Sequence, residues 1–174
     1  MLLQKQKIKG LILIKPEPFK DKRGLLRRIY CLEELRKKKI KFDIKQANIS
    51  ENKNIHTLRG FHYQESPHGE DKIITCIQGQ IHNIVIDMRK KSKTYMKWQS
   101  FDLSEKNRLA VLVPKGCANA YLTLKKKTWV LYFHSQFYKK GFEKSIRYND
   151  PKFNFNWPYK VKVISKKDNN AEFF

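Results

Sequence analysis

The sequence predicts a single all-β domain, built as an antiparallel sandwich or barrel. Three observations support this prediction: short β-branched or aromatic runs recur along the chain, turn signals separate them, and no internal repeat or linker divides the 174 residues. About 150 residues make one domain of ordinary size. With 40% hydrophobic and 13% aromatic residues, the chain is too apolar to be intrinsically disordered.

The individual elements follow from local composition. The predicted strands are Leu11–Ile14, Ile73–Ile77, Gln80–Met88, Leu109–Val113, Tyr121–Leu124 and Trp129–His134. The turn signals between them are Asp21–Gly24, Pro67–Gly69, Gly79 and Pro114–Gly116. One helix is expected from Leu32 to Lys39, because Leu32, Leu35 and Ile40 share approximately one helical face.

Alternation along two strands places polar side chains among apolar ones. Asn83 shares a face with Ile81 and Val85, and His134 shares a face with Tyr132. Such polar groups point either into a barrel interior, where ligands are held, or at solvent. Periodicity alone leaves both possibilities open.

The charge is the most conspicuous feature of the composition. Lys and Arg number 38 against 16 Asp and Glu, which gives a formal net charge of +22. A basic surface of this kind is one way to bind nucleic acid. However, 30 of the cations are Lys and only 8 are Arg, and they are scattered along the whole chain. We interpret most of this charge as solvated surface, partly reflecting A/T-rich codons, and we find no base-stacking or groove-reading motif.

Cysteine spacing and the N-terminal segment bear on compartment. Cys31, Cys76 and Cys117 form an odd, widely spaced set without a C-x-x-C pair, which favours reduced thiols and argues against a thiolate metal site. The run Leu11–Ile14 is too short for a signal-peptide core or a membrane span. We therefore expect a cytoplasmic protein with no membrane partner.

The densest cluster of reactive residue types lies between positions 59 and 72. Arg59 is suited to hold phosphate, His62 to take a proton, and Lys72 to stabilise an oxyanion. This combination suits an anionic substrate that loses a proton. Strict alternation would put Arg59 and His62 on opposite faces of a strand, so a shared pocket requires a bulge or a twist at Gly60.

Ordered motifs along nearly the whole chain carry a family resemblance. They are Pro18–Gly24, Leu58–Gln64, Gly79–Arg89, Leu103–Asn107, Pro114–Gly116, Leu131–Tyr132, Asn149–Pro151, Trp157–Pro158 and Ile164–Asp168. On these motifs the chain resembles the dTDP-4-dehydrorhamnose 3,5-epimerases and related nucleotide-sugar epimerases of the cupin fold. The resemblance implies a cupin-type antiparallel barrel or jelly roll with a few short helices. It implies one domain over residues 1–174, with an N-terminal arm and a C-terminal tail that packs on the barrel.

The resemblance assigns four catalytic residues. It implies that His62 is the general base and that Asp168 orients its imidazole. Tyr132 would return a proton from the opposite face, and Lys72 would lie near the keto oxygen of the sugar. No cofactor and no metal are implied.

The resemblance also assigns substrate-binding residues. Arg59 and Arg23 match diphosphate ligands, and the other matching positions are Phe19, Gln46, Asn48 and Asn119. In the family, the segment around Arg23 reaches into the neighbouring subunit's site, which implies a homodimer.

Two positions depart from the family pattern. Asn119 stands where a histidine is usual, and Asn83 stands where an aspartate is usual. We hypothesise that these two side chains are neighbours inside the barrel and that an Asp–His pair became Asn–Asn. Phe137 and Tyr138 keep the aromatic character of the base-binding region, but residues 133–136 match it loosely, so guanine is a credible alternative to thymine.

The function expected from the sequence is inversion of C3, C5 or both in a nucleoside-diphosphate 4-keto-6-deoxy sugar, through an enolate, in a route to cell-surface polysaccharide. The alternatives that stay open are inversion at a single centre, a GDP-linked 4-keto heptose as substrate, and a 3,4-ketoisomerase reaction. A non-catalytic cupin that binds nucleotide sugars forms a second class, and a basic β-barrel that binds nucleic acid forms a third.

Overall fold

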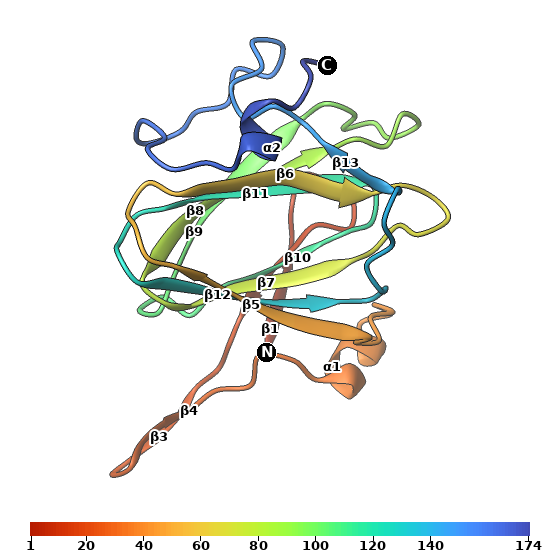
Figure 1. Ribbon diagram of the computed structural model, residues 1–174. Coiled ribbons are helices and arrows are strands. Elements are labelled where there is room, and N and C mark those ends of the chain that lie inside the picture. The colour runs from red at the N-terminus through yellow and green to blue at the C-terminus, as the bar shows by residue number, and fades with distance from the viewer.

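Two antiparallel β-sheets face each other in the computed structural model, which describes residues 1–174 (Figure 1). The first sheet has the strand order β1 (Leu2–Lys5), β2 (Ile12–Lys15), β10 (Ala110–Val113), β7 (Lys72–Gln78), β12 (Thr128–His134) and β5 (Gln46–Asn52). The second has the order β13 (Glu143–Ser145), β6 (Leu58–Gln64), β11 (Cys117–Thr123), β8 (Gln80–Asp87) and β9 (Trp98–Ser104). The chain is thus all-β, as the sequence predicts.

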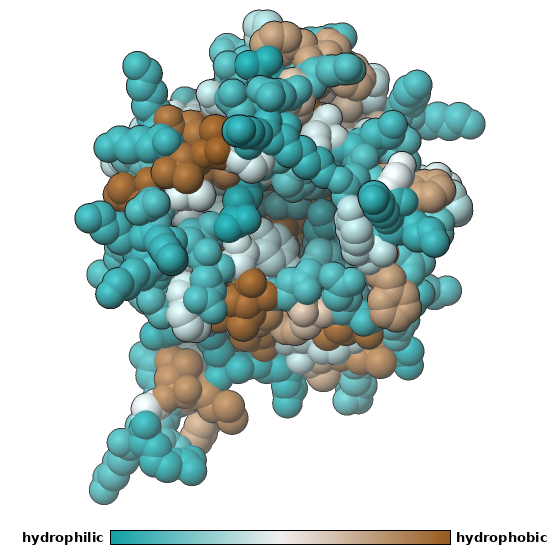
Figure 2. Space-filling model, viewed as in Figure 1, coloured by the Kyte–Doolittle hydropathy of each residue, from teal (hydrophilic) through white to brown (hydrophobic).

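A separate two-stranded hairpin, β3 (Phe19–Asp21) and β4 (Gly24–Leu26), extends away from the two sheets as an arm (Figure 1). All three residues of each strand are exposed. Figure 2 shows apolar residues gathered where this arm leaves the body. Because an isolated hairpin is at best marginally stable in water, the arm is the least self-supported part of the chain.

All six strands predicted from composition are present, with shifted ends. The largest shift is in β11, which begins at Cys117, four residues before the predicted start at Tyr121. The predicted helix Leu32–Lys39 is confirmed as α1 but ends at Lys37. The short helix α2 (Lys166–Asn169) was not predicted, and neither were β1, β3, β4, β5, β6, β9 and β13.

The space between the sheets is divided into an apolar part and a cavity. The apolar part is one cluster of thirteen buried residues from both sheets and the N-terminal segment, including Ile74, Val85 and Tyr121. The side chains of β8 alternate between the two faces of the sheet: Ile81 and Val85 belong to this inner cluster, while Ile84 and Ile86 belong to a second cluster on the other face.

Segments outside the sheets cover both outer faces. The C-terminal segment packs Phe153, Phe155 and Trp157 against the second sheet. The segment around α1 packs Leu35 and Phe42 against the first sheet. Each sheet therefore has apolar packing on both of its faces.

The bulge expected at Gly60 is present in β6. Asn119 of β11 pairs with His62 whereas Tyr121 pairs with Arg59, so β6 holds one residue more than its partner between these pairs. Gly60 has φ +107°, and a Cβ there would lie 2.5 Å from the carbonyl oxygen of Asn119. Glycine is therefore required, and the bulge turns Arg59 and His62 toward the same side.

Neither helix has the length or the apolar character needed to cross a bilayer.

Candidate active site

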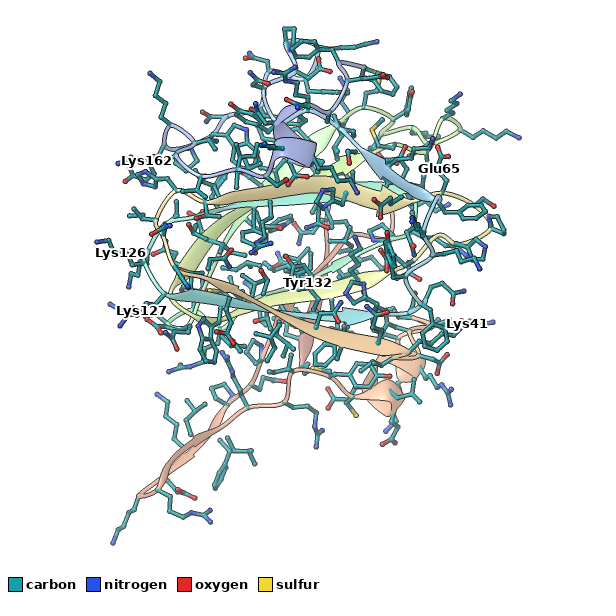
Figure 3. All side chains as sticks on the ribbon, viewed as in Figure 1. Lys41, Glu65, Lys126, Lys127, Tyr132 and Lys162 are labelled. Carbon is teal, nitrogen blue, oxygen red and sulfur yellow. The ribbon has the colours of Figure 1, made fainter.

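A cavity of about 700 Å³ opens between the two sheets. Figure 2 shows this hollow in the face of the molecule, and Figure 3 shows Tyr132 lying in the space between the sheets. Eight residues singled out from the sequence line it: Gln46, Asn48, Arg59, His62, Lys72, Asn119, Tyr132 and Asp168. They come from β5, β6, β7, β11, β12 and α2.

His62 and Asp168 form a hydrogen-bonded pair at one wall. Nε2 of His62 lies 2.7 Å from Oδ1 of Asp168. The Asp168 side chain is only 5% exposed, while the imidazole is 42% exposed. Because Asp168 takes Nε2–H, Nδ1 is the nitrogen left free to accept a proton.

Two local features hold the Asp168 carboxylate in place. Its Oδ2 accepts the backbone N–H of Gly60 at 3.2 Å, and its own backbone N–H donates to the hydroxyl of Ser165, the N-cap of α2, at 3.0 Å. Burial alone would raise the pKa of Asp168, but the hydrogen bond and charge of His62 outweigh it, so the pKa is below its usual value. The carboxylate is charged at neutral pH and stabilises an imidazolium.

Tyr132 lies on the opposite wall, on the inner face of β12. Burial raises the pKa of its phenol well above the ordinary value, and the hydroxyl of Tyr121 adds to this rise. Tyr121 in turn contacts the hydroxyl of Ser50 at 2.9 Å. Tyr132 is therefore protonated at neutral pH and can act as an acid.

Arg59 is held with its outer nitrogens unoccupied. Its Nε donates to Oδ1 of Asn52 at 2.9 Å, and its two terminal nitrogens make no hydrogen bond within the chain. Asn52 is buried and is itself fixed by the carbonyl of Thr128 at 3.0 Å. A guanidinium fixed through Nε offers its terminal fork to an anion such as a diphosphate.

Lys72 is part of a buried cluster that the sequence analysis missed. Its Nζ lies 3.1 Å from Oε1 of Glu70, and Oε2 of Glu70 lies 2.8 Å from Nδ1 of His134. All three side chains line the cavity. Two signals could have found this cluster: Glu70 stands two positions before Lys72, and His134 alternates with Tyr132 on one strand.

Two of the predicted substrate-binding residues do not reach this cavity. Phe19 and Arg23 lie on the β3–β4 arm, where the Phe19 residue is 64% exposed and the Arg23 side chain 88%. Arg23 is paired only with its neighbour Asp21, at 2.6 Å. Within one chain, these two residues are separate from the eight predicted residues that line the cavity.

Asn83 and Asn119 lie on the same inner face of adjacent strands. Asn83 of β8 pairs with Tyr121, two residues from Asn119 on β11, so the two amides are diagonal neighbours. The hypothesis that they lie close together agrees with this register, although no hydrogen bond joins them. Asn83 is fully buried and both of its amide atoms lack a partner, whereas Asn119 opens into the cavity beside His62.

No group of three or more His, Cys, Asp or Glu side chains is arranged to hold a metal ion. The three cysteines are free, and burial raises the pKa of the Cys76 and Cys117 thiols to about 12. These thiols are therefore inert at neutral pH.

Comparison with known proteins decides the family. The model of the family described as dTDP-4-dehydrorhamnose 3,5-epimerase matches residues 5–174. The chain belongs to this family. A dTDP-4-dehydrorhamnose 3,5-epimerase from Shigella flexneri is 30% identical over 173 residues, which cover 98% of this chain and 94% of that protein.

Solved structures of the epimerase family agree with the fold. The dTDP-6-deoxy-D-glucose-3,5-epimerase of Legionella pneumophila, in complex with dTDP-4-keto-L-rhamnose, matches with a TM-score of 0.93 at 28% identity, covering 99% of this chain and 92% of that one. A 3'-monoepimerase from Streptomyces bikiniensis, in complex with dTDP-quinovose, matches with a TM-score of 0.92 at 27% identity, covering 98% and 86%. The expected cupin-type fold is confirmed, and the chain is an epimerase, of the isomerase class.

Proposed function

We propose that this epimerase inverts C3, C5 or both in a dTDP-linked 4-keto-6-deoxy sugar, with His62 as base and Tyr132 as acid. One observation carries the proposal: the base and the acid lie on opposing sheets and face the same cavity. A sugar ring held between them would lose a proton to one wall and gain a proton from the other. That sequence inverts a carbon centre.

The chemistry follows from the keto group of the substrate. A ketone at C4 acidifies the C–H bonds at C3 and C5, because the electron pair left by the proton spreads onto oxygen as an enolate. Nδ1 of His62 takes the proton, and the charged Asp168 carboxylate stabilises the imidazolium that forms. Lys72 is the cation placed to stabilise the enolate oxygen.

Reprotonation completes the inversion. The phenol of Tyr132 gives its proton to the enolate carbon, and the C4 carbonyl is restored. The high pKa of Tyr132 keeps the phenol protonated before this step. The resulting phenolate regains a proton from solvent, and the imidazolium of His62 releases one, so the proton count closes.

The nucleotide part of the proposal rests on the surroundings of the cavity. Arg59 offers a free guanidinium fork to the diphosphate. Gln46, Asn48 and Tyr138 line the same cavity, and an aromatic ring such as Tyr138 suits stacking on a base. We take thymine as the base because both related structures are described with dTDP-linked ligands.

The test is incubation of the protein with dTDP- and GDP-linked 4-keto-6-deoxy sugars in D₂O. We expect deuterium at C3, C5 or both of the dTDP sugar, read by mass spectrometry and assigned by NMR. Label at one carbon alone would identify a single-centre epimerase, and movement of the carbonyl to C3 would identify a ketoisomerase. Binding without any exchange would overturn catalysis in favour of a nucleotide-sugar-binding cupin.

We further propose that the working unit is a homodimer in which the β3–β4 arm of one subunit completes the site of the other. The arm carries exposed Phe19, Leu25 and Leu26 and has no sheet of its own chain to cover. Its Arg23 would then supply a second cation for the diphosphate. Burial of the apolar arm against a second copy accounts for an otherwise unsupported hairpin.

Mixing two inactive variants tests the shared site. Arg23→Ala disables the arm and His62→Asn disables the base, so each homodimer is expected to be nearly inactive. A mixed dimer contains one site with an intact arm and an intact base, and activity should return after the subunits exchange. Absence of recovery in a mixture that native mass spectrometry shows to contain the heterodimer would refute the shared site.

We also expect the enzyme to act in the cytoplasm. The three unpaired cysteines support a reducing compartment.

A further inference from the structure

The cavity holds a second histidine–carboxylate pair, and it is joined to Lys72. Glu70 bridges Lys72 and His134. Its Oε1 lies 3.1 Å from the Lys72 ammonium, and its Oε2 lies 2.8 Å from Nδ1 of His134. The side chains of Lys72, Glu70 and His134 are 9%, 8% and 13% exposed. They come from the start of β7, the loop before it and the end of β12.

The hydrogen bonds of the ammonium can be counted. Lys72 has three N–H groups. One reaches Glu70, and one donates to the backbone carbonyl of His62 at 3.4 Å. No third partner exists within the chain, so one N–H is left for whatever occupies the cavity.

The hydrogen bonds of His134 fix its role in the same way. Nδ1–H donates to Glu70, and Nε2 lies 3.3 Å from Nδ2 of Asn48, an arrangement in which Nε2 accepts. Both ring nitrogens are thus occupied, and the ring stacks on Tyr132 with centroids 5.9 Å apart. His134 is built into the wall and leaves no nitrogen for a reacting atom.

The electrostatic balance of the cluster depends on Glu70. It is the one acid within ion-pair distance of Lys72. Burial alone would raise the pKa of Glu70, but the hydrogen bond from His134 and the charge of Lys72 hold it below its usual value. The other titratable side chains that line the cavity are Arg59, His62, Tyr63, Tyr132, Tyr138, Glu143, Lys167 and Asp168.

We propose that Glu70 and His134 are positioning residues for Lys72, and that together they keep the ammonium charged with one N–H free for the enolate oxygen. Glu70 supplies the counter-charge that a buried ammonium requires. His134 occupies the second carboxylate oxygen, so Glu70 cannot hold Lys72 with both oxygens and take up the free N–H. This inference rests on the proposed enolate chemistry.

The first variant is Glu70→Gln, which keeps the size of the side chain and removes its charge. We expect kcat to fall about 10- to 100-fold, as for a misplaced catalytic group, with KM little changed because Arg59 is untouched. Without its counter-charge, Lys72 loses its proton more readily, so activity should fall further as pH rises. A wild-type kcat with a wild-type pH profile would overturn the inference.

Two substitutions at position 134 separate positioning from mere packing. His134→Asn keeps an N–H donor near the place of Nδ1 and should retain most of the activity. His134→Ala frees the carboxylate to hold Lys72 with both oxygens, so kcat should fall while KM changes little. His82→Asn, at a histidine–carboxylate pair outside the cavity, is the matched control and should leave kcat unchanged. Equal kcat values for the Asn and Ala variants at position 134 would argue against the role of His134.

A readout that needs no turnover keeps this inference separate from the proposed function. Competitive labelling with acetic anhydride across a pH series, read by peptide mass, measures how readily Lys72 loses its proton. In Glu70→Gln, Lys72 should be labelled at lower pH than in the wild type. An unchanged labelling profile would refute the role of Glu70, whereas absence of deuterium exchange by the wild-type protein would refute only the proposed reaction.

Discussion

Two histidine–aspartate pairs in this molecule have the same hydrogen-bond length and opposite surroundings. His62–Asp168 and His82–Asp102 are each joined at 2.7 Å. In the first pair the acid is 5% exposed and the imidazole 42%; in the second the acid is 59% exposed and the imidazole 14%. The two pairs differ in which partner is exposed and in the ring nitrogen that meets the acid, which is Nε2 in His62 and Nδ1 in His82.

This contrast shows why distance alone does not identify a catalytic pair. Asp168 is buried and fixed by Gly60, so its charge acts on an imidazole that opens into a cavity. Asp102 is solvated, and the Nε2 atom of His82 is buried without a partner beside Trp157. On the proposed mechanism, the first pair exchanges a proton with the substrate, whereas the second pair contributes to stability alone.

The sharpest test of this comparison is the same substitution in both pairs. His62→Asn should lower kcat about 10²–10⁴-fold, because it removes a positioned base. His82→Asn should leave kcat within error and reduce the free energy of unfolding by about 1 kcal/mol, the worth of one hydrogen bond. Turnover assays and urea unfolding measure both. Substantial turnover by the His62 variant would mean that another group is the base.

Replacing the two acids extends the comparison. Asp168→Asn keeps the shape but removes the charge that stabilises the imidazolium, and we expect kcat to fall about 10²–10⁴-fold. Asp102→Asn, at an exposed acid, should change neither kcat nor KM. If both variants lost activity equally, the burial of Asp168 would not be the property that matters.

The effect of Asp168→Asn on the free energy of unfolding should depend on pH, and the direction of this dependence follows from the pKa of Asp168. The folded-state pKa of Asp168 is lowered, so its contribution to stability is present above the unfolded value of about 3.9 and is lost as pH falls through the folded value. The stability advantage of the wild type over Asp168→Asn should therefore shrink below about pH 4. Urea unfolding of both proteins between neutral and acid pH would measure it, and a constant difference would contradict the assignment.

The smallest effect on kcat is expected from a change in Ser165, which helps to hold Asp168 of the first pair in place. Ser165→Ala removes the N-cap of α2, which costs about 1 kcal/mol of local helix stability. Since α2 carries Asp168, fraying of this turn should lower kcat by up to about tenfold, while global stability changes little. Activity at the wild-type level would show that the contact with Gly60 is sufficient to hold the carboxylate.

The sequence predicted those strands whose buried residues form a run of β-branched or aromatic side chains. β8 and β12 contain runs of β-branched and aromatic residues, and both were predicted with nearly correct ends. By contrast, most residues of β5 (Gln46–Asn52) are polar and exposed. The strand therefore contains no apolar run from which it could be predicted. The short helix α2 is polar and is held by a cap and by contact with β6, which are properties of the assembled molecule.

The site was predictable to the extent that its residues lie near one another in sequence or match the family motifs. His62, Lys72, Tyr132 and Asp168 line one cavity, and Gly60 does mark a bulge. The partnership of Glu70 with His134 joins residues 64 positions apart through the pairing of β7 with β12. Such a contact depends on strand register, which composition does not specify.

The place of Asp168 in the chain has a consequence for biosynthesis. It follows every strand of both sheets and reaches back 106 positions to His62. On the proposed mechanism, a chain that has paired its strands but has not yet docked its tail holds a base without its carboxylate. The proposed mechanism therefore makes docking of the tail on β6 the last structural step before activity.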